Sequence, residues 1–306
     1  DIERGGVFGS VVGTAHLLSA DERSLFRGFA INKFRGDMSL FDEGVRILED
    51  RTGSTCFGVF PHTADLHLDA EDSLALQTRP STPPPAGARL AIVHLPHVSN
   101  ATDFRLLTWA DWITSPRADR YDFIILPGTK NTLADLSWLR DTGLADWILQ
   151  QHRSGTTIIG VCGGYQMLGR AIRDPAWMES SDEEAEGLGL VPATTCLSRE
   201  KQTRAVRATT WRGVPFGGYE IHLGVTTLDR SDDFIPFARL DEGGVDGVRG
   251  AGVIGTYLHG AFEHPDVCAD VFGIDMPSTA SKAVHYERLA AWFGRHARHL
   301  DKLGLS

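Results

Sequence analysis

The sequence lacks the features that mark membrane, secreted and nucleic-acid-binding proteins. No apolar run approaches the roughly 18 residues needed to span a bilayer, and no basic-then-apolar signal segment opens the chain. Basic residues are in the minority, because 30 Lys and Arg stand against 40 Asp and Glu, for a net charge of −10. Since an acidic surface repels phosphate backbones and anionic lipids, we expect neither nucleic acid nor a membrane as a partner.

Cysteine is also scarce, and its spacing argues against the common structural uses of thiols. The four cysteines form no CxxC pair, and no secretory context accompanies them. We therefore expect no disulfide or zinc framework, assign no metal site, and expect a cytoplasmic location. A free cysteine is usually a buried hydrophobic side chain, and this is our expectation for Cys56, Cys196 and Cys268.

A phosphate-binding loop of the form GxxxxGK[ST] is absent from the sequence as well. The chain opens at Asp1, and the segment 1–14 reads as the end of a strand, then a loop and a helix. We therefore interpret the sequence as a fragment of a longer protein.

What the sequence does contain is a globular composition with an alternating pattern of strand-like and helix-like segments. Hydrophobic residues make up 42% and charged residues 23% of the 306 residues, which suggests about two domains. Four prolines between 80 and 85 indicate a semi-rigid spacer. We accordingly place a linker at 79–88, between domains at 1–78 and 89–306. Short apolar strands that alternate with helices predict an α/β fold with parallel strands in both domains.

The expected elements can be placed along the chain. In the first domain, helices at 7–18 and 40–51 alternate with strands at 28–34 and 56–60. Short alternating segments at 187–229 predict antiparallel strands added to one edge of the second domain's parallel sheet. That domain is then a three-layer α/β sandwich, with strands at 89–95, 121–128, 156–161 and 253–259, and helices at 102–113, 134–151 and 283–303.

The segment TTIIGVCGGYQMLG (156–169) is the strongest indication of chemistry. An apolar strand leads into Cys162, with Gly160 two residues before it and Gly164 two residues after. This is the form of a nucleophile elbow, a tight strand-to-helix turn that needs small neighbours. The turn would place the Cys162 sulfur at a helix N-terminus, where the helix dipole favours the reactive thiolate. The backbone N–H of Gly163 would be free to bind a developing oxyanion.

A thiolate nucleophile needs a base, and His259 is the best candidate. It ends the apolar segment VIGTYL and precedes Gly260, so we expect it at the carboxyl edge of the sheet. Sites in open α/β sheets assemble at that edge, and Cys162 is expected there too. The two residues can thus form a Cys–His pair. His285, His296 and His299 are instead expected on a solvated face of the last helix, whereas His222 in GGYEIHLG attracts more interest.

A second oxyanion donor is expected from the segment ILPGTKNT (125–132). A strand ends there in Pro-Gly, and glycine leaves the backbone amide open to a ligand. The donor could be the amide of Gly128 or that of Thr129.

Three segments together resemble the class I glutamine amidotransferase domain of the cobyric acid synthases, which are enzymes of the cobalamin pathway. They are VCGGYQMLG (161–169), GGYEIHLG (217–224) and GTYLHGAF (255–262). LPHVSNATDF (95–104) and LPGTKNT resemble segments near the start of that domain. Three further segments resemble the second half of the family's ATP-dependent synthetase domain. They are DIERGGVF, INKFRGD (31–37) and the segment ending in EDSLAL (71–76). The resemblance covers essentially the whole chain. It implies a flavodoxin-like, mostly parallel amidotransferase domain that is preceded by part of an α/β synthetase domain.

The resemblance implies roles for named residues. Cys162 would attack the side-chain amide of glutamine, His259 would move the proton, and the amides of Gly128 and Gly163 would hold the oxyanion. The ammonia would amidate a corrinoid, adenosylcobyrinic acid a,c-diamide, at carboxylates activated by ATP and Mg²⁺, giving adenosylcobyric acid. Residues expected on the substrate side are Tyr219, Glu220 and His222.

Two departures from the family pattern matter. Many amidotransferases of this class carry a glutamate two residues after the histidine, where this chain has Ala261. The third catalytic residue is therefore unassigned, with Glu263 and Glu220 as candidates.

The second departure lies in the synthetase segment. Asp1 and Glu3 resemble its Mg²⁺ segment, although the family usually has Asp in place of Glu3, and Asn32 and Lys33 resemble a nucleotide-base motif. The alternative is that these four are simply polar residues at strand ends. Without the phosphate-binding loop, we expect glutamine hydrolysis at most from this chain.

Three alternatives stay open. The first is a related amidotransferase with another acceptor, such as cobyrinate a,c-diamide synthase or an enzyme that amidates a cell-wall lipid. The second is a non-catalytic binding remnant, and the third is a cysteine hydrolase of the same fold. Exposed sheet edges could drive association, so a homodimer is also left open.

Overall fold

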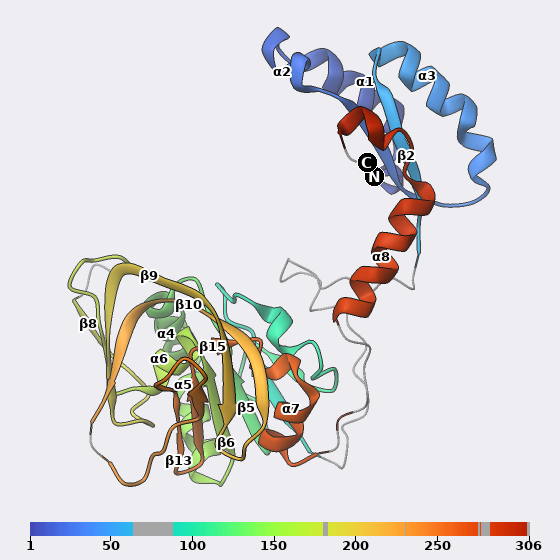
Figure 1. Cartoon of the computed structure of the whole chain (residues 1–306). Helices are drawn as coiled ribbons and strands as arrows, with labels where there is room; N and C mark the ends of the chain where they lie inside the picture. The colour runs from blue at the N-terminus through green and yellow to red at the C-terminus, as the bar shows by residue number, and fades with distance from the viewer. Residues whose placement is uncertain (64–87, 180–182, 230, 275, 277–281, 305–306) are drawn as a thin grey trace. The chain divides into compact units, whose positions relative to one another are not determined.

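The computed structural model describes residues 1–63, 88–179, 183–229, 231–274, 276 and 282–304. Its contacts divide the chain into two units, Asp1–Leu68 with Ala280–Ser306, and Asp69–Thr279 (Figure 1). This division differs from the expected one at the C-terminal end, because the last segment groups with the N-terminal unit and not with the rest of 89–306. The prolines of the expected linker at 79–88 lie outside the described residues.

The first unit is built around two parallel strands, as its alternating pattern predicts. Its sheet pairs β1 with β2, and the last helix, α8, packs on β2. The ring of Phe60 lies 5.4 Å from that of Trp292 and 5.2 Å from that of Phe293. This contact explains why α8 belongs here. The elements are α1 (Val7–Leu17), α2 (Ala20–Leu25), β1 (Gly28–Phe34), α3 (Asp42–Thr52), β2 (Thr55–Pro61) and α8 (Lys282–His296).

The second unit is centred on a mostly parallel sheet, which confirms the α/β prediction. Its strands run in the order β13-β14-β6-β5-β3-β4, and only β13, of the strands on this path, pairs antiparallel to its neighbour. Strand β3 is buried along its whole length, as expected for a strand covered on both faces. The strands are β3 (Leu90–Val93), β4 (Asp111–Ile113), β5 (Phe123–Leu126), β6 (Thr157–Val161), β13 (Val248–Gly250) and β14 (Val253–Thr256).

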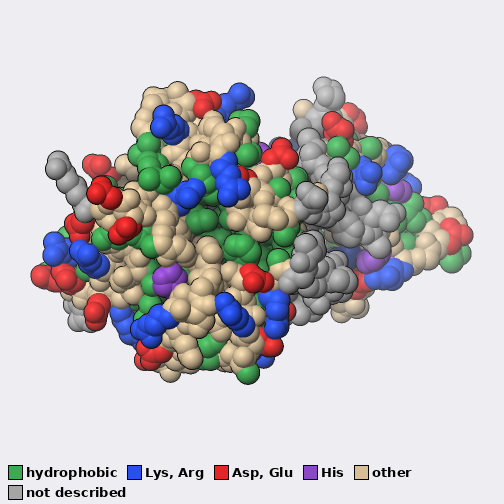
Figure 2. Space-filling view, turned by 90° about the horizontal axis from the view of Figure 1, so that it is seen from below, with side chains coloured by type: hydrophobic (Ala, Val, Ile, Leu, Met, Phe, Trp, Pro, Cys, Tyr) green, Lys and Arg blue, Asp and Glu red, His purple; other side chains and the backbone are tan. Residues whose placement is uncertain are grey.

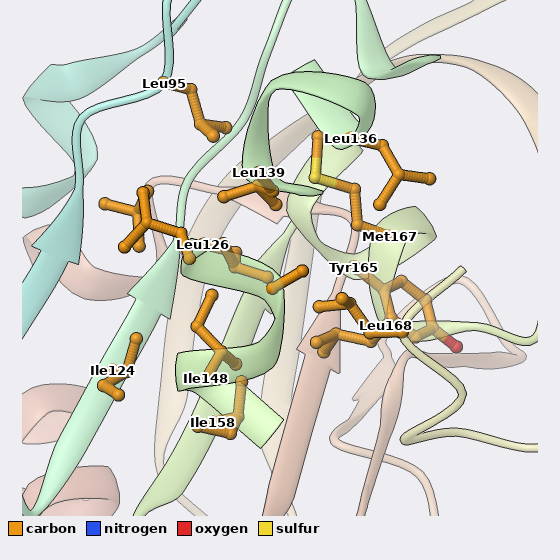
Figure 3. Packing of buried hydrophobic residues seen from close by; sticks show 14 of the residues in the cluster. Leu95, Ile124, Leu126, Leu136, Leu139, Ile148, Ile158, Tyr165, Met167 and Leu168 are labelled. Carbon is orange, nitrogen blue, oxygen red and sulfur yellow. The ribbon is translucent and has the colours of Figure 1, made fainter. Parts of the chain in front are cut away.

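One face of this sheet is covered by helices. Alternate strand residues such as Ile124, Leu126 and Ile158 point into a core that they share with Leu136 and Met167 (Figure 3). This period of two is what a strand with two buried faces requires. The helices are α4 (Thr132–Asp141), α5 (Leu144–Arg153) and α6 (Gly163–Leu168).

The opposite face is covered by a second sheet and by α7 (Pro265–Phe272). The expected antiparallel strands at 187–229 therefore do not extend the edge of the parallel sheet. They pair with each other over most of their length, and β10 pairs onward with the short strand β15. The sheet has the path β12-β11-β9-β10-β15; off this path, β7 pairs with β9, and β8 pairs with β7. Its strands are β7 (Ala171–Arg173), β8 (Glu184–Glu186), β9 (Ala193–Thr210), β10 (Pro215–Leu228), β11 (Ala238–Leu240), β12 (Val245–Asp246) and β15 (Leu258–His259).

Four expected elements differ from the structure. The helix expected at 102–113 is wrong, because only Ala101–Phe104 forms a 3-10 turn and Asp111–Ile113 pairs with β3 as an edge strand. The helix expected at 134–151 is two helices, broken at Gly143, whose φ of 74° no regular helix allows. The strand expected at 253–259 is divided between the two sheets, and the last helix ends at His296.

The surface carries charges of both signs. On the face shown in Figure 2, acidic and basic side chains are interspersed without a region of one sign. Among the described helices, none has the length and apolar character needed to cross a bilayer.

The tight packing of α6 on β5 gives a first prediction. A Cβ atom at Gly164 would lie 2.0 Å from the carbonyl oxygen of Leu126. Gly164→Ala should therefore lower the free energy of unfolding by roughly 1–3 kcal/mol or more, because the packed core cannot yield without strain.

Denaturant unfolding of the variant beside Gly217→Ala measures the effect. A Cβ at Gly217 would meet nothing within 4 Å, so this control should be far milder. Equal stabilities of the two variants would contradict the close approach at Gly164.

Candidate active site

Cys162 lies at the sharp turn between β6 and α6, as the nucleophile-elbow pattern predicts. Its φ of 53° and ψ of −111° are unusual for a residue with a side chain. The Cys162 N–H donates to the Thr256 carbonyl at 2.8 Å, and its own carbonyl accepts from the Gln166 N–H at 3.0 Å. Glycine is required beside it, since a Cβ at Gly160 would come within 2.7 Å of the Gly164 backbone. The turn leaves the Cys162 side chain almost fully buried, with the thiol 3.5 Å from the Ile221 carbonyl oxygen.

His259 reaches Cys162 from the neighbouring strand. β14 pairs in parallel with β6, so that Thr256 lies opposite Val161, and the chain then enters β15. The His259 side chain is fully buried, and the neighbouring Cys162 thiol is one of the groups that raise its pKa. The structure thus brings together the two strand-end residues that the sequence predicts as a pair.

Asp103 is the carboxylate that contacts the histidine, and the sequence reasoning missed it. Its Oδ2 accepts from His259 Nδ1 at 2.7 Å, and its Oδ1 accepts from the Gly260 N–H at 2.9 Å. The two candidates proposed for this position bind arginines instead, Glu220 binding Arg204 at 2.7 Å and Glu263 binding Arg105 at 3.2 Å.

A signal for Asp103 was present in the sequence. The residue lies in LPHVSNATDF (95–104), a segment that resembles the amidotransferase family. Asn100, in the same segment, places its amide nitrogen 3.3 Å from His259 Nε2. Because we expected a helix at 102–113, we did not consider Asp103 as a partner of His259. In the structure Asp103 lies in the 3-10 turn Ala101–Phe104, and Asn100 directly precedes that turn.

The electrostatics of His259 favour its charged form. Burial disfavours charge on the ring, but the hydrogen bonds with Asp103 and Cys162 outweigh it and raise the pKa of His259 to about 10. Near neutral pH His259 is therefore an imidazolium that lies beside both Asp103 and Cys162. Such a partner favours the nucleophilic form of a cysteine.

A cavity of about 300 Å³ opens at Cys162. Side chains of both charges line it, namely Glu179, Lys130 and Lys201, together with the amide of Gln166. The Glu179 carboxylate accepts from the backbone N–H groups of Thr132 and Leu133 at the start of α4, and burial raises its pKa. The cavity therefore offers polar groups beside a nucleophile.

Of the two expected oxyanion donors, Gly163 lines this cavity, and Gly128 directly precedes Thr129, which also lines it. A Cβ at Gly128 would be 3.0 Å from His259 Cε1, and a Cβ at Gly163 would be 2.5 Å from Thr129 Cγ2. The Gly128 carbonyl accepts from the Ser99 N–H at 2.8 Å, which fixes the loop. Gly163 is the first residue of α6, where backbone N–H groups lack partners within the helix.

The expected substrate-side residues take different places. The ring of Tyr219 stacks on that of His259 at 5.3 Å, and burial raises the pKa of Tyr219 to about 12. His222 lines the cavity, stacks on Tyr257 at 3.9 Å and has a pKa lowered by burial. Glu220 is turned to Arg204 and does not line the cavity.

In the first unit, three of the four residues expected to bind nucleotide or Mg²⁺ form a charged cluster. Lys33 Nζ lies 3.0 Å from Asp1 and 3.9 Å from Glu3, and Glu3 also binds Arg35 at 2.7 Å. Asn32 accepts from the Lys33 N–H through its side chain. Within the described ranges, no group of three or more His, Cys, Asp or Glu is arranged to hold a metal. Two carboxylates nevertheless fit an Mg²⁺ ion whose other ligands are phosphates and water.

The contact between His259 and Asp103 gives a second prediction. Asp103→Asn should lower the pKa of His259 by roughly 1–3 pH units, because it removes a negative charge and a hydrogen-bond acceptor. The folded-state pKa of His259 lies above its ordinary value of 6.5. The stability from this contact is therefore complete below pH 6.5 and is lost as the pH rises through about 10.

NMR titration of the ring and unfolding at several pH values measure both effects. Glu263→Gln is the matched control, because it removes a carboxylate that binds Arg105. An unchanged His259 pKa in Asp103→Asn would refute the assignment.

Comparisons with known proteins show which family the sequence matches. A family model described as the CobB/CobQ-like glutamine amidotransferase domain matches residues 89–267. A cobyric acid synthase of Bacteroides fragilis is 39% identical over 97% of this chain and 63% of its own length. A probable cobyric acid synthase of Thermococcus kodakarensis is 43% identical over 86% of this chain and 55% of its own length.

Among solved structures, one described as a glutamine amidotransferase is 14% identical, with a TM-score of 0.44, and the match covers 70% of this chain and 98% of that one. The chain spans at most 63% of the length of the two relatives named above. Because the family model covers more than half of the chain, the protein belongs to the family of CobB/CobQ-like glutamine amidotransferase domains.

Proposed function

We propose that this protein hydrolyses glutamine at Cys162 and supplies ammonia to the corrinoid amidation of a cobyric acid synthase. The observation that carries the proposal is that three buried residues, Cys162, His259 and Asp103, lie next to one another beside a polar cavity. Similarity to cobyric acid synthases over most of the chain supports the corrinoid as acceptor, because relatives that match both units bear that name.

The reaction follows from the positions of these residues. The Cys162 thiolate adds to the side-chain amide carbon of glutamine, and the amide oxygen becomes an oxyanion near the N–H groups of Gly163 and Gly128. His259 then gives its proton to the departing nitrogen, so that ammonia leaves and a glutamyl thioester remains. Water, deprotonated by His259, attacks the thioester, and glutamate leaves as the thiolate re-forms. Asp103 holds the imidazole by its Nδ1 throughout.

The cavity suits a free amino acid. Glutamine carries an ammonium and a carboxylate on one carbon. Of the residues that line the cavity, Glu179 would pair with the ammonium, and Lys130 and Lys201 would pair with the carboxylate. We infer that these charges select the zwitterion over an amide in a peptide, because a peptide lacks the ammonium that would neutralise the half-buried Glu179 carboxylate.

In this proposal the first unit contributes residues to the acceptor reaction, whereas for this chain alone, without a phosphate-binding loop, the expected activity stays glutamine hydrolysis. ATP, when bound, would supply the activation of a carboxylate as an acyl phosphate. Asp1 and Glu3 would hold Mg²⁺, and Asn32 and Lys33 would contact the nucleotide. The ion pairs around Lys33 keep Asp1, Glu3 and Lys33 together, and Lys33 and Arg35 would supply positive charge for a polyphosphate.

A third prediction tests the nucleophile. Cys162→Ala should abolish ammonia release from glutamine, because alanine cannot form the thioester. Cys196→Ala is the matched control, since Cys196 is an exposed cysteine of the same unit. Ammonia release by the purified proteins is the measurement, and equal rates in wild type and Cys162→Ala would exclude the proposed site.

A fourth prediction tests substrate recognition. Glu179→Gln should raise the KM for glutamine on the order of 10-fold or more, because a charge-assisted hydrogen bond contributes about 1.5–3 kcal/mol. The turnover number should change less, since Glu179 does not touch the reacting atoms. A KM equal to that of the wild type would show that the ammonium binds elsewhere.

A further inference from the structure

Asp246 is a buried carboxylate that lies outside the site described above. Its exposed fraction is 4%, and it ends the short strand β12. Its backbone carbonyl accepts from the Phe237 N–H at 3.1 Å. The next residue, Gly247, passes so close to β14 that a Cβ there would lie 2.1 Å from the Gly255 carbonyl oxygen. Asp246 is therefore held firmly against the end of β14.

Its carboxylate organises the point at which the chain passes from one sheet to the other. Asp246 Oδ1 accepts from the Tyr257 N–H at 3.1 Å, and its Oδ2 accepts from the Thr256 hydroxyl. The same hydroxyl oxygen accepts from the Leu258 N–H at 3.0 Å. β14 ends at Thr256 and β15 begins at Leu258, so one carboxylate fixes all three residues of the crossing.

This crossing connects the two catalytic residues. The carbonyl of Thr256 accepts from the Cys162 N–H at 2.8 Å, and Leu258 directly precedes His259. The Tyr257 hydroxyl accepts from the Gln166 side chain at 3.2 Å, beneath the cavity. A shift of the crossing would therefore move the nucleophile and the base relative to each other.

The environment of Asp246 makes its protonation state sensitive to pH near neutrality. The titratable and charged groups around it are Glu220, Arg204, Tyr165 and Tyr257. Burial, with a smaller contribution from Glu220, raises the pKa of Asp246 to about 7, against the lowering effect of its hydrogen bonds and of Arg204.

Protonation would disturb the crossing. The Thr256 hydroxyl would then face two donors, the carboxyl O–H and the Leu258 N–H, and its own proton would lose its acceptor. The hydrogen bonds are complete only with the carboxylate ionised.

We propose that Asp246 is a positioning residue, whose ionised carboxylate holds the crossing Thr256–Leu258 in the geometry that sets His259 against Cys162. Glutamine hydrolysis then depends on a residue that touches neither the substrate nor the reacting atoms. This inference rests on the proposed glutaminase function.

The test compares Asp246→Asn with Asp270→Asn. Asp270 also accepts from a threonine hydroxyl, that of Thr210 at 2.9 Å, and its side chain is 6% exposed, but it lies on α7. Asp246→Asn should lower kcat on the order of 100-fold, the cost of misplacing catalytic groups by about 1 Å, with a much smaller change in KM. The wild-type loss of kcat as the pH falls through about 7 should disappear in this variant. Asp270→Asn should leave kcat and its pH profile unchanged.

A second pair of variants separates positioning from folding. Thr256→Val removes the hydroxyl and should lower kcat as Asp246→Asn does, whereas Thr256→Ser keeps the hydroxyl and should retain activity. Wild-type kcat and pH profile in a folded Asp246→Asn variant, or equal activity of Thr256→Val and Thr256→Ser, would overturn the inference.

Alkylation of Cys162 by iodoacetamide distinguishes failure of this inference from failure of the proposed function. If the wild type releases no ammonia, the glutaminase proposal fails. The rate of Cys162 alkylation between pH 5 and 9 still reports the Cys162–His259 pairing, and it should differ between wild type and Asp246→Asn. Identical alkylation profiles in the two folded proteins would overturn the positioning role.

Discussion

The left-handed backbone of Cys162 is the constraint on which the rest of the site depends. A side-chain-bearing residue adopts this conformation only when its surroundings compensate the strain. Here the compensation comes from two directions, the Thr256 carbonyl on the neighbouring strand and the first turn of α6. The glycines around Cys162 follow from the same constraint, because α6 must approach β5 and β6 more closely than a Cβ allows. The apolar strands, the short helix and the glycine pattern thus serve one backbone geometry.

The site also depends on the meeting of two sheets. Cys162 follows a strand of the parallel sheet, whereas His259 lies in β15, which pairs with β10 of the second sheet. Asp103 comes from a third element, a loop after β3. The three side chains therefore keep their distances only while both sheets stay packed through the apolar residues between them. Such a packed core is close to incompressible, so it can hold catalytic groups to within fractions of an ångström.

The sequence was sufficient to predict those parts of the site that depend on local sequence pattern. Strand ends share one edge of a parallel sheet, and glycines beside a cysteine indicate a tight turn, so Cys162 and His259 could be predicted as neighbours. Asp103 could not, because residues 102–113 have a helix-like pattern and only pairing with β3 makes Asp111–Ile113 a strand. The surface on which α8 packs could not be predicted from the sequence either. Its amphipathic pattern requires an apolar surface to cover but does not say whether Phe60 or the amidotransferase sheet provides it.

The grouping of α8 with β2 makes the first unit discontinuous in sequence. The chain leaves that unit, builds the whole amidotransferase unit and then returns. On the ribosome, β2 would lack its helical cover until α8 is synthesised, while the inserted unit could already fold. The insertion also joins the two units by two covalent crossings. A protease that cuts one crossing would leave the two units attached through the other.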